Sequence, residues 1–70
     1  ALPATQKDIE DMFEHLEAEL DASGFLRPPE KRPRMVRNIR AMLLRADLTD
    51  QEVRTLRGIV TSLVKKRGGN

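Results

Sequence analysis

Three segments of this chain carry apolar side chains at helical spacing, and no other feature constrains its fold as strongly. The first segment has Ile9, Met12, Phe13, Leu16 and Leu20 on one helical face. No run of alternating β-branched and polar residues competes with this pattern, so we predict an all-α chain. The corresponding positions of the other two segments are Met35, Val36, Ile39, Met42 and Leu43, then Val53, Leu56, Ile59, Val60, Leu63 and Val64.

Residues typical of helix ends bound each segment. Thr5 and Thr49 are each followed three residues later by an acid, which is the spacing of a capping box. Gly24 favours a left-handed helix end, and Pro33 suits the first position of the next helix. The prolines at 28, 29 and 33 predict an irregular connector. We expect a small three-helix antiparallel bundle, with helices over about 6–22, 33–46 and 50–66, inside a single domain at 5–67 that is followed by a flexible tail at 68–70.

The composition excludes several kinds of protein. Without cysteine, the chain has no disulfide and no thiolate metal site, and a single histidine excludes a histidine-rich one. No apolar run is long enough to span a membrane, and the N-terminus lacks the signal-peptide pattern. Seventy residues are too few for a deep catalytic cleft or a doubly wound nucleotide-binding fold. This composition fits a reducing, cytoplasmic setting.

His15 is the one side chain that titrates near neutral pH. It lies off the apolar stripe among acids, and no Ser or Cys has the local spacing of a nucleophile paired with it. We therefore expect a surface histidine and predict no catalytic, cofactor-binding or metal-binding residue in the chain.

Charge is divided unevenly along the chain, although the net charge is only +2. Residues 1–30 carry eight acids and two bases, whereas residues 31–70 carry eleven bases and three acids. Arginine forks bind phosphates, and without interleaved aromatic residues the contacts would be to backbone phosphates, not stacked bases. A solvated face balanced by the acidic helix is the alternative. The predicted RNA-binding residues are Lys31, Arg32, Arg34, Arg37, Arg40, Arg45, Lys65, Lys66 and Arg67.

Two neighbouring residues of the third segment suggest contacts. Arg57 falls close to the buried stripe, so we expect a structural ion pair with the acidic first helix, RNA contact being the alternative. Gly58 costs about 1 kcal/mol relative to alanine inside a helix, which favours close approach by another helix.

Several short motifs occur in an order that is found in one family. From about Met12 to Val60 the chain resembles the C-terminal appendage of bacterial SPOUT-superfamily tRNA 2′-O-methyltransferases, the cytidine/uridine type in the TrmJ-like group of the TrmH family. That family often has two adjacent arginines where this chain has Arg40-Ala41. The matching motifs are Phe13-Glu14-His15-Leu16-Glu17, Gly24-Phe25-Leu26, Ile39-Arg40, Arg45-Ala46 with Leu48, Glu52 and Leu56-Arg57-Gly58-Ile59.

The resemblance implies a parent enzyme with an N-terminal knotted α/β domain. That domain would bind S-adenosylmethionine, form a homodimer and hold the catalytic residues. This chain would be the C-terminal helical domain, without an activity of its own, and residues 1–4 would end an interdomain linker. Its partner would be tRNA.

Two other functions remain open from the residues alone. One is a helical protein-interaction or dimerisation module in which Leu44 and Gly58 meet a partner. The other is a DNA-binding helix-turn-helix whose reading helix starts at Thr49, although Asp50 and Glu52 at its start would disfavour contact with a groove.

Overall fold

The computed structural model describes residues 2–68, with side chains as far as Lys65. Its elements are α1 (Gln6–Ser23), the short 3₁₀ turn η1 (Pro29–Lys31), α2 (Arg32–Arg45) and α3 (Asp50–Gly68). The predicted all-α class is confirmed, and the helix bounds lie within two residues of those expected. Within residues 2–68, no helix is both long and apolar enough to cross a membrane.

Side chains close the helix ends as the sequence predicts. The Thr5 hydroxyl accepts from the Asp8 N–H at 3.1 Å, and the Thr5 N–H donates back to the Asp8 carboxylate at 3.4 Å. Thr49 and Glu52 form the same reciprocal pair at the start of α3, with distances of 3.1 and 2.9 Å. Gly24 ends α1 with φ 85°, in the left-handed region. Both capping boxes and the glycine stop are therefore confirmed.

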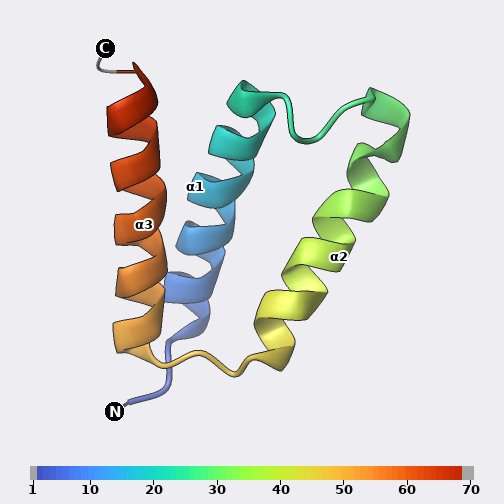
Figure 1. The fold of residues 1–70 in the computed structure, drawn as a ribbon. Coiled ribbons are helices and arrows are strands. Elements are labelled where there is room, and N and C mark those ends of the chain that lie inside the picture. Colours follow the sequence, from blue (N-terminus) through green and yellow to red (C-terminus); the bar gives the residue numbers. More distant parts are fainter. Residues whose placement is uncertain (1, 69–70) are drawn as a thin grey trace.

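The three helices lie side by side in one layer. In Figure 1, α1 lies between α3 and α2, and α2 runs antiparallel to both. The extents of the chain are 36, 31 and 16 Å, so the molecule is flattened in one direction. The antiparallel three-helix arrangement is thus confirmed, in a flat form in which α1 supplies both inner contacts.

The core lies where α1 meets α3. Met12 and Phe13 of α1 and Val53 of α3 are only 2–3% exposed. The partly buried side chains around them come from the N-terminal segment, all three helices and the turn before α3, namely Ala4, Ile9, Leu43, Leu48 and Leu56.

Three apolar residues expected in the core are exposed instead. Met42, Ile59 and Leu63 have exposed fractions of 54%, 49% and 61%. A single layer covers each outer helix on one side only, whereas the apolar stripes of α2 and α3 are wider than that contact. Their predicted burial is therefore wrong.

The connections are also more ordered than expected. Pro29 opens η1 where an irregular connector was predicted, and α2 begins at Arg32, which makes Pro33 its second residue. At the other end of the layer, the Leu2 carbonyl accepts from the Asp50 N–H at 2.9 Å. The Ala4 N–H donates to the Leu48 carbonyl at 3.2 Å, so the segment before α1 is tied to the turn before α3.

Candidate nucleic-acid interface

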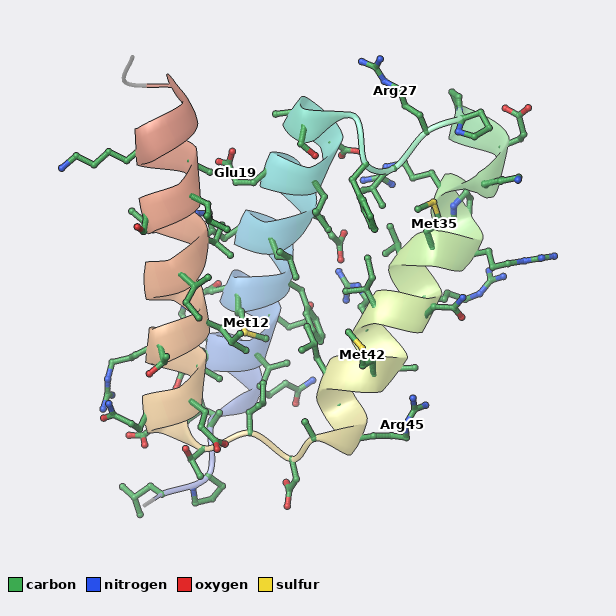
Figure 2. The ribbon with its side chains drawn as sticks, viewed as in Figure 1. Met12, Glu19, Arg27, Met35, Met42 and Arg45 are labelled. Carbon is green, nitrogen blue, oxygen red and sulfur yellow. The ribbon has the colours of Figure 1, made fainter. Side chains whose placement is uncertain are left out.

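One side of α2 presents a row of arginines that is free for a ligand. Arg34, Arg37 and Arg45 are exposed, and at 3.6 residues per turn they fall within about 80° of arc. Figure 2 shows Arg45 pointing away from α1. None of the three forms an ion pair or side-chain hydrogen bond with the described part of the chain. We call these three residues the outer arginine row.

Arg32, at the start of α2, faces α1 instead. Its Nε and Nη2 atoms donate to the two carboxylate oxygens of Asp21, at 2.8 and 2.7 Å. This bidentate hydrogen bonding lowers the pKa of the Asp21 carboxyl below its usual range. The pair joins the end of α1 to the beginning of α2.

Arg40 makes three contacts with α1. Its Nε donates to Glu17 at 2.7 Å and its Nη1 to Glu10 at 3.4 Å. The guanidinium carbon lies 4.7 Å from the centre of the Phe13 ring, which is a cation–π distance. The hydrogen bond that Arg40 donates to Glu17 is the main cause that raises the pKa of Arg40. The Arg40 side chain is 34% exposed and that of Glu17 is 16% exposed.

The remaining predicted RNA-binding residues are spread over two other places. Lys31 is exposed in η1, next to the outer arginine row, and Lys65 is exposed on α3. The side chains of Lys66 and Arg67 lie outside the described residues. The structure therefore brings Lys31 together with the row and leaves Lys65 on the far outer helix (Figure 1).

Arg57 and Gly58 differ from their expected surroundings. The Arg57 side chain is exposed and forms no ion pair with the described part of the chain, so the predicted structural ion pair is not found there. Its charge adds to the hydrogen bond from Lys7 in lowering the pKa of Asp11. A Cβ atom built on Gly58 would meet nothing within 4 Å, so no helix of residues 2–68 approaches it closely.

His15 is half-buried, whereas the sequence analysis predicted a surface histidine. Its Nδ1 atom is enclosed and has no hydrogen-bond partner in the described part of the chain. Across residues 2–65, His, Asp and Glu side chains form no group of three or more that could hold a metal ion. The outer arginine row therefore offers exposed cations to an anionic partner.

A comparison with family models decides where the chain belongs. Residues 7–70 match the family described as "tRNA methyltransferase TrmJ, C-terminal domain". The chain is a member of that family. Among curated proteins, it is 41% identical over 64 residues to the tRNA (cytidine/uridine-2′-O-)-methyltransferase TrmJ of Escherichia coli (strain K12), and equally to those of Shigella flexneri and Shigella sonnei (strain Ss046).

The match to these relatives covers 90% of the chain and 25% of each relative. The chain thus spans about a quarter of the length of the family proteins it matches. No solved structure matches it significantly.

Proposed function

We propose that this chain is a tRNA-holding accessory domain of an S-adenosylmethionine-dependent tRNA 2′-O-ribose methyltransferase. The outer arginine row, exposed and without carboxylate partners among residues 2–65, is the observation that carries the proposal. Membership of a tRNA methyltransferase family and the names of the curated relatives supply the class of RNA.

The residues point to a mechanism of binding by charge and shape. Arg34, Arg37 and Arg45 recur along about 17 Å of helix at 1.5 Å per residue, so they can follow several phosphates of an RNA backbone. Lys31 extends this set at the η1 end, and Lys65, Lys66 and Arg67 would add contacts from α3. Phe13 is buried, so stacking of RNA bases on that ring has no role.

Methyl transfer would take place in another part of the parent protein. A knotted N-terminal domain would bind S-adenosylmethionine, transfer the methyl group and form the homodimer, in the cytoplasm. Residues 1–4 would be the end of the linker from that domain, and their hydrogen bonds to the turn before α3 would fix the direction in which the linker leaves.

Fluorescence anisotropy with unfractionated tRNA across a salt series tests this function. Because phosphate contacts release counterions, the logarithm of the association constant should fall linearly with that of the salt concentration. The three arginines of the outer row would contribute about −3 to that slope, and conversion of Arg34, Arg37 and Arg45 to glutamine should remove this contribution.

Arg54→Gln is the matched control, because Arg54 is an exposed arginine on α3 that already pairs with Asp50 and Gln51. It should leave the slope nearly unchanged. Absence of binding at low salt, or a triple variant that binds like the unaltered chain, would refute the proposal.

A protein-interaction module is the second candidate, because apolar surface is left open on α3. A hollow of about 110 Å³ between the C-terminal parts of α1 and α3 is lined mostly by apolar side chains, and the exposed Leu63 is part of its wall. Ile59, on the same helix, is also exposed. Sedimentation at several concentrations tests self-association, and a monomer throughout would remove the support for a dimerisation module. The main lining side chains are Leu16, Leu20, Val60, Leu63 and Val64.

A further inference from the structure

Arg40 is the cation of α2 that is most completely engaged within the chain. Glu17 and Glu10 occupy two edges of its guanidinium, and Phe13 lies against its face. Two of the five N–H donors of Arg40 and one face of its guanidinium are already taken, and two carboxylates offset its charge, so a phosphate would compete with these groups. The outer arginine row has no such competitors among the described residues.

The attachment of α2 to the layer gives this contact its importance. α1 and α3 approach each other closely along their backbones, while α2 is held to α1 by side chains. Leu43 packs against the core, Arg32 binds Asp21, and Arg40 binds Glu17. Arg32 and Arg40 are eight residues apart, or about 12 Å along the helix, so together they fix its rotation as well as its position.

From this geometry we infer that Arg40 is a positioning residue, not a phosphate ligand: it clasps α2 to α1 so that the outer arginine row faces the RNA. The inference deepens the proposed tRNA-holding function and rests on it for its last step. The clasp itself consists of Arg40, Glu17, Glu10 and Phe13.

Substitution of Arg40 by lysine distinguishes a positioning residue from a phosphate ligand. Lysine keeps the positive charge and would still attract a phosphate, but its compact ammonium cannot bridge two carboxylates while stacking on a ring. Arg40→Lys should therefore lower both the melting temperature and the tRNA affinity. Arg37→Lys, a matched change at an arginine without a carboxylate partner in the described residues, should leave the melting temperature close to that of the unaltered chain.

The salt dependence of tRNA binding distinguishes the positioning role from the phosphate-ligand role a second time. Arg37→Gln should reduce the slope by about 0.9, because one phosphate contact is lost. Arg40→Gln should lower the affinity on the order of tenfold at every salt concentration, as expected if the binding-competent orientation of α2 is populated about a tenth of the time. Its slope should stay unchanged, and its melting temperature should fall by about 5 °C. Measurements well below that temperature keep the protein folded.

A charge exchange completes the test without any RNA. Thermal unfolding of Arg40→Glu, Glu17→Arg and the double variant should show that the second change restores part of the stability lost with the first. Recovery should be incomplete, because a glutamate at position 40 faces Glu10 and loses the cation–π contact with Phe13. The clasp is overturned if the two changes are simply additive.

If tRNA does not bind but the exchange restores stability, the proposed function fails and the clasp stands. If Arg40→Gln reduces the slope like Arg37→Gln and leaves the melting temperature unchanged, Arg40 is a phosphate ligand and the inference is wrong.

Discussion

Two glycines of this chain have opposite conformational requirements. Gly24 has φ 85°, which side-chain-bearing residues adopt at a cost of about 1–2 kcal/mol, while the space around it would accept a methyl group. Gly58 lies inside α3 with open space around it, and alanine there favours the helix by about 0.5–1 kcal/mol. We expect Gly24→Ala to lower and Gly58→Ala to raise the free energy of unfolding measured in urea. A loss of stability with Gly58→Ala would mean that an element of another molecule packs there.

At the same scale, the sequence predicts the exposed side of α2 but not the ion pairs that Arg32 and Arg40 form with α1. Arg34, Arg37 and Arg45 follow from helical periodicity alone, since they lie opposite the apolar stripe. The engagement of Arg40 depends on which side of α1 faces α2, and periodicity within one helix cannot supply that. A signal was present: Glu10 and Glu17 are seven residues apart, two turns on the face beside Phe13.

Between elements, the pair of Asp21 and Arg32 should make stability depend on pH. The pKa of Asp21 is lowered in the folded chain below its ordinary 3.8, so the pair stabilises the fold above pH 3.8. That contribution is lost as the pH falls through the lower folded value. The melting temperature of Asp21→Asn should therefore lie below that of the unaltered chain near neutral pH and approach it in acid. Glu30→Gln is the control, because Glu30 is an exposed acid of η1 that has no ion pair in the described residues. Its melting temperature should stay close to that of the unaltered chain near neutral pH. An Asp21→Asn difference that persists unchanged in strong acid would show that the ion pair is not its cause.

The ends of the elements were the most predictable part of this fold. Capping depends on residues three positions apart, so the boxes at Thr5 and Thr49 are readable without any tertiary information. The 3₁₀ turn at Pro29 and the bridge of Leu2 and Ala4 to the turn before α3 were missed. The bridge joins segments more than forty residues apart, and no local pattern encodes it.

For the whole molecule, the flat arrangement explains both the missed exposures and the separation of charge. Helix α1 uses one side for the apolar contact with α3 and the other for carboxylates that meet α2. The outer sides of α2 and α3 are left to solvent or to partners. This leaves the basic row on the outer side of α2, away from the carboxylates of α1, where the long-range attraction of a polyanion is not cancelled at close range.

Because α1 contacts both other helices, we expect a core substitution in α1 to destabilise the whole molecule, and a substitution in α2 to destabilise α2 alone. Phe13→Ala removes a side chain that is 2% exposed and that touches both the core and Arg40. The cost of about 3–5 kcal/mol is comparable with the whole stability of a domain this small, so all three helices should lose protection from amide hydrogen exchange together. Leu43→Ala acts at the edge of the core, where Leu43 is only partly buried, and should increase exchange in α2 while α3 stays protected. Equal loss of protection in α3 for both variants would show that α2 is an integral part of the cooperative core, and not a separately attached carrier of the arginine row.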